Sequence, residues 1–264
     1  MACKIILVTR ANRGIHTRRL SFLSLSERAG VKKSGISFAI VQALSIRFPQ
    51  HTYLLGVRPV PSGEEAISSL QSLSLTSTFA TIEINITDDT SVTSTASQVS
   101  ERFGHLDVLV NNAAIKPDAP DFRIFFNQIL DTNVTSVVQV TQAFLSALHA
   151  SPSKKPQVIK ISSARGSIHQ QTNNALPPTA SIPYLVSKTA FNVTMLEMGK
   201  LEPGVLLQAV RPGHCRTAFN GFRGTKDPAD GASVVVELVE DEWGRWGVGF
   251  WEVKGEWGVE RVPW

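Results

Sequence analysis

Short apolar runs of strand length alternate with longer amphipathic stretches along almost the whole of this chain. The run Ile5–Val8 is apolar at every position, which predicts a strand buried on both faces, as in a parallel sheet covered by helices. The expected strands are residues 4–9, 52–57, 79–84, 106–111, 157–162, 205–210 and 249–253, and the expected helices are residues 38–47, 63–73, 90–103, 122–148 and 184–199. The alternation predicts a single α/β domain over residues 1–264, a doubly wound parallel sheet of about seven strands with helices on both faces.

The charge distribution argues against nucleic acid as a partner. The net charge is +4 over 264 residues, and five cations and one glutamate between His16 and Ile36 account for all of it. A neutral body with one basic segment does not resemble a nucleic-acid binder, which spreads phosphate contacts over a folded face.

Cysteine content and hydropathy favour the cytoplasm. Two cysteines, Cys3 and Cys215, give neither a disulfide framework nor the spacing of a metal site, so no metal is expected. The apolar run that starts at Lys4 is too short to span a bilayer and lacks the long apolar region of a signal peptide. We therefore expect no membrane association.

Tyr184 and Lys188 stand four residues apart in a stretch of helical periodicity, so one helix face carries both side chains. An ammonium group beside a phenol favours tyrosinate and is expected to lower the tyrosine pKa from about 10 towards neutrality. Such a phenol can exchange a proton with a substrate oxygen. By itself, a Tyr-x-x-x-Lys pair is more often a solvated helix face, so the residues that accompany it decide its meaning.

The pair is one of six motifs that occur in a fixed order. They are Thr9-x-x-x-Arg13-Gly14-Ile15, Asn111-Asn112-Ala113-Ala114, Asn133, Ser163, Tyr184-x-x-x-Lys188 and Pro212-Gly213. In order and approximate spacing, the chain resembles the short-chain dehydrogenase/reductase family from Lys4 to about Thr217, and its tail resembles the carbonyl-reductase branch. The resemblance implies a Rossmann-like fold and an oxidoreductase that acts on a small-molecule carbonyl or alcohol, with a homo-oligomer possible.

The resemblance also implies the catalytic residues. Tyr184 would be the acid/base that gives a proton to a carbonyl oxygen as hydride arrives, and Lys188 would lower its pKa and bind ribose hydroxyls. Ser163 would hydrogen-bond the substrate oxygen. Asn133 matches the asparagine whose backbone holds a water that connects the lysine to solvent; a buried helix amide is the alternative.

The cofactor residues come from the same resemblance. Asn111 to Ala114 matches the stretch beside the adenosine ribose, and Pro212 and Gly213 with Thr217 resemble the segment that meets the nicotinamide carboxamide. Asn85 stands where the family has an aspartate near the adenine. The expected cofactor-binding residues are Thr9, Arg13, Gly14, Ile15, Arg58, Asn85, Asn111, Ala113, Lys188, Pro212, Gly213 and Thr217.

The choice of cofactor follows from charge. No carboxylate stands at the end of the second expected strand to accept bonds from a ribose 2′-hydroxyl, as NAD would require. Arg58 offers a guanidinium fork for a 2′-phosphate there, and Arg13 is a second cation on the same side. NADP, as NADPH, is therefore favoured over NAD.

The glycine-rich turn departs from the family pattern. Arg10 stands where the first glycine is usual, at a cost of about 1 to 3 kcal/mol if its φ must be positive. An atypical segment, about residues 16–34, separates Gly14 from the helix whose N-terminus should receive the pyrophosphate. It is a basic loop that contacts phosphate or a partner, a tolerated extrusion, or a translated non-coding stretch, and we favour the third interpretation.

Two functions remain open at this stage. The first is an NADPH-dependent oxidoreductase that reduces a carbonyl, or oxidises a secondary alcohol, with Tyr184 as acid/base. The second is a non-catalytic or cofactor-impaired dinucleotide-fold protein with a binding or regulatory role, because the glycine-rich turn is disrupted.

Overall fold

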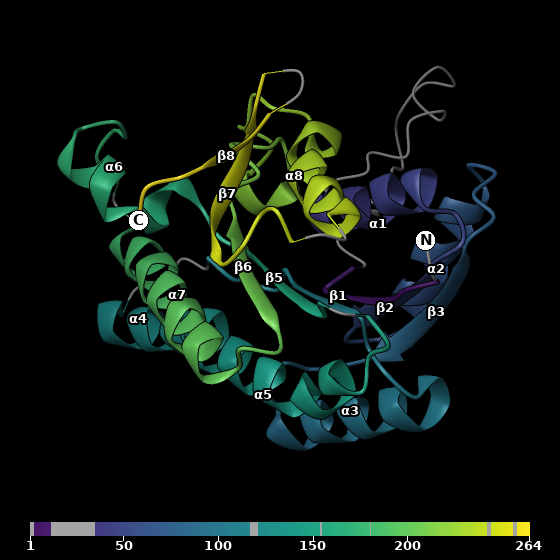
Figure 1. The fold of residues 1–264 in the computed structure, drawn as a ribbon. Coiled ribbons are helices and arrows are strands. Elements are labelled where there is room, and N and C mark those ends of the chain that lie inside the picture. Colours follow the sequence, from purple (N-terminus) through teal and green to yellow (C-terminus); the bar gives the residue numbers. More distant parts are fainter. Residues whose placement is uncertain are drawn as a thin grey trace, which may run out of the picture.

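The computed structural model describes residues 3–11, 35–116, 121–153, 155–179, 181–241, 244–255 and 258–264. These residues form one eight-stranded sheet in the order β3-β2-β1-β4-β5-β6-β7-β8, in which only β8 runs antiparallel to its neighbour (Figure 1). The strands are β1 Ile5–Thr9, β2 Thr52–Val57, β3 Thr78–Glu83, β4 Val108–Asn111, β5 Gln157–Ile161, β6 Leu206–Val210, β7 Gly249–Lys254 and β8 Gly258–Arg261. The predicted doubly wound parallel sheet is confirmed. The eighth strand was not expected, because its four residues carry no apolar run.

Helices cover both faces of the sheet (Figure 1). One face packs against α1 Ile36–Arg47, α2 Val60–Gln71 and α8 Pro228–Glu240. The other packs against α3 Asp89–Phe103, α5 Ser136–His149 and α7 Ile182–Leu201. Two further helices, α4 Phe122–Leu130 and α6 Ile168–Thr172, lie near the ends of α7. Among the described residues, no helix is long and apolar enough to cross a bilayer.

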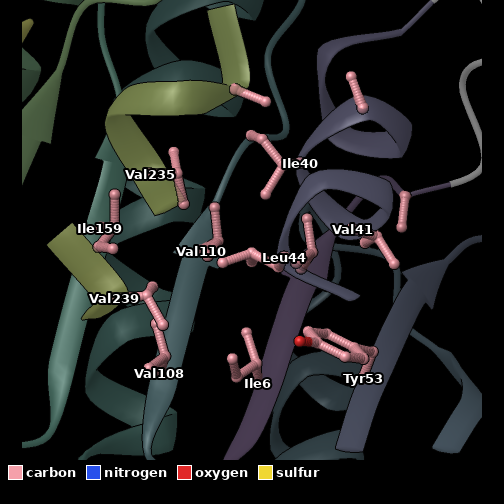
Figure 2. Packing of buried hydrophobic residues seen from close by; sticks show 14 of the residues in the cluster. Ile6, Ile40, Val41, Leu44, Tyr53, Val108, Val110, Ile159, Val235 and Val239 are labelled. Carbon is pink, nitrogen blue, oxygen red and sulfur yellow. The ribbon is translucent and has the colours of Figure 1, made fainter. Parts of the chain in front are cut away.

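The core beneath α1 and α8 is built from branched aliphatic side chains (Figure 2). Ile6 of β1 and Val110 of β4 meet Ile40 and Leu44 of α1 and Val235 of α8, and all five are completely buried. Burying such a side chain contributes roughly 1.5 to 3 kcal/mol. This packing fixes the sheet, and with it the carboxyl ends of the strands.

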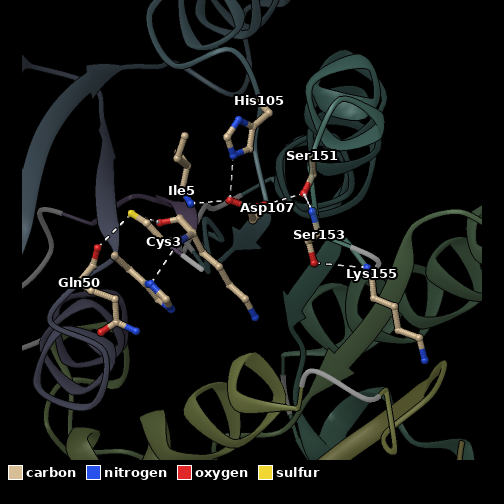
Figure 3. A network of polar contacts seen from close by, with 10 residues as sticks. Cys3, Ile5, Gln50, His105, Asp107, Ser151, Ser153 and Lys155 are labelled. Carbon is tan, nitrogen blue, oxygen red and sulfur yellow. Dashed lines mark hydrogen bonds and ion pairs between the residues drawn. The ribbon is translucent and has the colours of Figure 1, made fainter. Parts of the chain in front are cut away.

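The amino ends of the central strands are joined by a buried carboxylate (Figure 3). Asp107 accepts hydrogen bonds from the Ile5 backbone N–H (2.6 Å) and the Ser151 hydroxyl (2.5 Å), and it lies 3.2 Å from His105 Nε2. Because Asp107 immediately precedes β4, these contacts lock β4 to the start of β1.

The single helix predicted over residues 122–148 is not continuous. A π-helical turn, η2 Asp131–Thr135, separates α4 from α5. Its buried Asn133 side chain reaches out of the helix to neighbouring backbone, which apolar periodicity cannot reveal. π-Turns of this kind are frequent at functional sites.

Asp88 is the N-cap of α3, and its carboxylate accepts from the N–H groups of Thr90 and Ser91. The predicted inserted segment, residues 16–34, lies outside the described residues, as do Arg13, Gly14 and Ile15.

Candidate active site

A cavity of about 540 Å³ opens at the carboxyl ends of β1, β4, β5 and β6. Ser163 follows β5, and Tyr184 and Lys188 come from the first turns of α7; all three line this cavity. The start of α1 lines the same cavity. Ligands of doubly wound sheets bind in this crevice, where the strand order reverses between β1 and β4.

Ser163, Tyr184 and Lys188 are positioned by short contacts. A side-chain hydrogen bond joins Ser163 to Tyr184. The Lys188 ammonium donates to the Ile161 carbonyl over 2.7 Å and lies 5.6 Å from the centre of the Tyr184 ring. The predicted proximity of the phenol and the ammonium on one helix face is therefore present.

The pKa values differ from the expectation. Burial raises the pKa of Tyr184 to about 12, and the hydrogen bond with Ser163 only partly opposes this rise. Burial lowers the pKa of Lys188 to about 8. The expected lowering of the tyrosine pKa by the lysine is therefore wrong for this structure, because desolvation outweighs the attraction and the ammonium is bound to a backbone carbonyl.

Asn133 does not line the cavity but supports its wall. Its side chain accepts from the Ile115 N–H (2.8 Å) and donates to the Ile115 carbonyl (3.0 Å) and the Ser187 hydroxyl (3.1 Å). The amide thus ties the segment after β4 to the helix that carries Tyr184 and Lys188.

The cofactor half of the cavity is formed by Arg10 and by Gly35, Ile36 and Ser37 at the start of α1. The N-cap residue of α1 is Gly35, which has no side chain to cap the first turn. Arg10 has φ +59°, the left-handed conformation in which glycine is favoured. The end of β1 and the start of α1 therefore line the same cavity as Ser163, Tyr184 and Lys188, although α1 is far from β1 in sequence.

Two of the residues predicted to bind the cofactor, Thr9 and Asn111, have side chains that form hydrogen bonds with neighbouring elements of the fold. Thr9 is buried; its hydroxyl donates to the Val110 carbonyl (3.3 Å) and accepts from the N–H groups of Asn112 (3.0 Å) and Ala113 (3.2 Å). The Asn111 amide donates to the Thr141 hydroxyl of α5 over 3.0 Å. Neither Thr9, Asn111 nor Ala113 lines the cavity; their neighbours Asn112 and Ala114 do.

Of the other described residues that were predicted to bind the cofactor, some line the cavity and some do not. Pro212, Gly213 and Thr217 line the cavity, and Gly213 has φ +87°. Arg58 is exposed directly after β2, and the Asn85 side chain accepts from the Thr87 hydroxyl (3.1 Å); neither lines the cavity.

Sequence reasoning missed cavity residues that no family motif marks. Lys116, Arg165 and Arg211 line the wall, as does Phe219, whose ring lies 5.7 Å from that of Tyr184. Their nearness in sequence to Ala114, Ser163 and Pro212 is the only signal that could have indicated them.

Comparison with known proteins agrees with this geometry. A family model described as short chain dehydrogenase matches residues 32–227. A short-chain dehydrogenase/reductase of Aspergillus fumigatus is 30% identical over 284 aligned residues, covering 99% of this chain and 97% of that protein. A short-chain dehydrogenase of Penicillium roqueforti is 33% identical over 217 residues, covering 78% of this chain and 85% of that protein. The solved structure of NADPH-bound carbonyl reductase from chicken fatty liver has a TM-score of 0.76 at 22% identity over the whole of both chains, a similarity of fold.

Proposed function

Because this chain belongs to the short-chain dehydrogenase family of oxidoreductases, we propose that it reduces a small-molecule carbonyl to an alcohol with NADPH, and that Tyr184 is its acid/base. The observation that supports this most is that one cavity brings Ser163, Tyr184 and Lys188 together with the start of α1. The first three residues offer groups for proton transfer, and the N-terminus of a helix is where a phosphate group would bind.

NADPH fits the charges around the site better than NADH. Arg58 directly follows β2, the strand that pairs with β1, so its guanidinium belongs to the same edge of the sheet as Arg10. A guanidinium fork suits a ribose 2′-phosphate, whereas a ribose 2′-hydroxyl requires a carboxylate. We expect Arg58→Ala to weaken NADPH binding about tenfold and to leave NADH binding unchanged.

The residues of the site divide the work of carbonyl reduction. Ser163 donates a hydrogen bond to the substrate oxygen and orients the carbonyl. Tyr184, with its pKa raised to about 12, stays protonated at neutral pH and transfers its phenolic proton to the same oxygen. The bound nicotinamide supplies the hydride. Lys188 uses one ammonium N–H to hold the Ile161 carbonyl, and its remaining N–H donors would hold the ribose hydroxyls of the cofactor.

The deciding experiment is a fluorescence titration of the purified chain with NADPH and with NADH. The matched variant carries Arg10→Gly and lacks residues 16–34. Saturable NADPH binding by the native chain, with turnover of a generic carbonyl compound that disappears in Tyr184→Phe, would support the proposal. If only the matched variant binds, the alternative of a cofactor-impaired regulatory protein would replace it. A cytoplasmic location and a homo-oligomer remain predictions.

A further inference from the structure

The described cavity wall carries an excess of positive charge. Five of its residues are Arg or Lys, and among the described lining residues none is Asp or Glu; the cations are Arg10, Lys116, Arg165, Lys188 and Arg211. The cofactor phosphate and ribose, in the function proposed above, account for Arg10 and Lys188. Three cations remain on the side where the substrate would bind.

Arg165 is the cation closest in sequence to the reacting centre. It lies two residues beyond Ser163, and its backbone N–H donates to the Ser163 hydroxyl oxygen over 3.2 Å. Its half-buried guanidinium donates through one nitrogen to the Pro177 carbonyl over 2.5 Å. Within the described part of the chain, no carboxylate lies within ion-pair distance of this guanidinium. The side chain therefore faces the cavity with an uncompensated charge and further N–H donors.

Arg211 in the same wall is different. Its Nε lies 3.2 Å from Oε2 of the buried Glu252, and one terminal nitrogen donates to the Gln170 side chain over 3.1 Å. A protein carboxylate already compensates this charge, so Arg211 is a poor anchor for an anion.

Lys116, in the loop after β4, supplies a second cation, and among the described residues no carboxylate lies within ion-pair distance of it. Its neighbour Ile115 is held at both its N–H and its carbonyl by Asn133. Apolar side chains, among them Leu176, Pro177 and Phe219, line the same cavity. The cavity thus combines apolar surface with cationic groups.

We propose that the substrate is an apolar carbonyl compound that also carries a carboxylate, and that Arg165 binds this carboxylate while Ser163 and Tyr184 engage the carbonyl. Only the role of Ser163 and Tyr184 at the carbonyl rests on the proposed reductase function; the binding of the carboxylate by Arg165 does not. A guanidinium with free donors in a partly desolvated wall binds a carboxylate through charge-assisted hydrogen bonds, often two at once. Arg165 is then the residue that determines specificity for the acid.

The test compares probes that differ only in charge. They are 3- and 4-acetylbenzoate and their methyl esters, assayed with the full chain and NADPH. For whichever of the two acetylbenzoates is the better substrate, we expect kcat/KM to be about tenfold or more higher than for its methyl ester, because its KM is lower. Arg165→Gln keeps a donor for the Pro177 carbonyl but removes the charge, and it should abolish the preference for the acid over its ester. Equal use of acid and ester by the native chain, or a preference that survives in Arg165→Gln, would overturn the inference.

Arg223→Gln is the matched control. Arg223 also donates to a backbone carbonyl, that of Asn220 (3.1 Å), but it does not line the cavity. This variant should keep the preference for the acid. Thermal melts of both variants separate loss of binding from loss of folding.

Binding measurements separate this inference from the reductase proposal. Calorimetric titration of 4-acetylbenzoate into the protein with NADP⁺ reports the anion site without turnover. Binding that is lost in Arg165→Gln without any carbonyl reduction would support the anion site and reject the reductase. Reduction of the esters without binding of the acid would support the reductase and reject the anion site.

Discussion

The Ser37 hydroxyl donates to the Arg10 carbonyl over 2.7 Å, although the two residues are 27 positions apart. The bond joins the first turn of α1 to the residue that follows β1. The start of α1 therefore lies beside the end of β1, as a dinucleotide site requires. This contact weakens the argument that the atypical segment displaces the helix N-terminus.

Arg10→Gly should raise the free energy of unfolding. A non-glycine residue at φ +59° costs about 1 to 2 kcal/mol, and glycine removes this strain while adding about 0.5 to 1 kcal/mol of unfolded-state entropy. We expect a net gain of up to about 1 kcal/mol, measured by urea denaturation. Asparagine tolerates the left-handed region but retains a Cβ. The free energy of unfolding of Arg10→Asn should therefore lie between those of the wild type and Arg10→Gly. A glycine variant less stable than the wild type would show that the contribution of the arginine side chain outweighs the strain.

Tyr184→Phe should lower kcat for carbonyl reduction by a factor of about 10² to 10⁴ without weakening NADPH binding. Because burial raises the pKa of Tyr184 to about 12, the phenol is protonated across neutral pH. Reduction should then be insensitive to pH between about 6 and 8, whereas oxidation of an alcohol, which needs tyrosinate, should accelerate with rising pH. Initial rates in both directions, with Tyr184→Phe as the control for solvent catalysis, check this. An oxidation rate that is flat above neutrality would contradict the raised pKa.

The centre of the sheet was predictable because strands such as β1 are buried on both faces and form continuous apolar runs in the sequence. The grouping of Ser163, Tyr184 and Lys188 in one cavity was predictable because Tyr184 and Lys188 are held at helical spacing, and because Ser163 follows β5 closely. These features are local in sequence. The π-turn at Asn133 was not, since it depends on hydrogen bonds to Ile115, which lies on another segment.

The electrostatics of the site could not be predicted from spacing. The i, i+4 relation places Lys188 beside Tyr184, but the free energy of desolvating each group depends on the whole fold and reverses the expected direction of the tyrosine pKa. The roles of Thr9 and Asn111 depend in the same way on tertiary partners, here β4 and α5. The cations of the cavity wall, such as Lys116, Arg165 and Arg211, come from segments far apart in the chain, so no short stretch of sequence contains them all.

Asp107→Asn should destabilise the fold at the amino ends of the strands (Figure 3). The carboxylate accepts from Ile5 and Ser151 and faces His105, whereas an amide has a single acceptor oxygen and turns two donors toward these donors. Loss of charge-assisted bonds at a buried site should lower the free energy of unfolding by about 2 to 3 kcal/mol at pH 7. Chemical denaturation measures this loss. Ser153→Ala, which alters only a bond to the Lys155 N–H at 3.3 Å, is the control and should change stability by less than about 1 kcal/mol.

Lys160→Met should stabilise the protein. Lys160 lies on β5 with its side chain completely buried; its ammonium is 3.8 Å from the Met198 sulfur and 5.2 Å from the centre of the Phe191 ring. Burial lowers its pKa from 10.5 to about 8. That shift corresponds to about 3 kcal/mol of lost stability at pH 7, of which the attraction to Phe191 returns about 1 kcal/mol. An unbranched methionine of similar length should therefore raise the free energy of unfolding by about 2 kcal/mol.

The gain should depend on pH with a definite sign. Below pH 8 the lysine is charged in both states, so the folded state bears the full desolvation penalty. Between pH 8 and 10.5 the folded state has lost the proton while the unfolded state retains it, so the wild-type chain gains stability as pH rises. The difference between Lys160→Met and wild type should thus shrink across this interval, because Lys188 and all other groups are common to both. Urea denaturation at pH 7 and pH 9.5 measures it, and a difference that grows with pH would show that the lysine is stabilised as a cation.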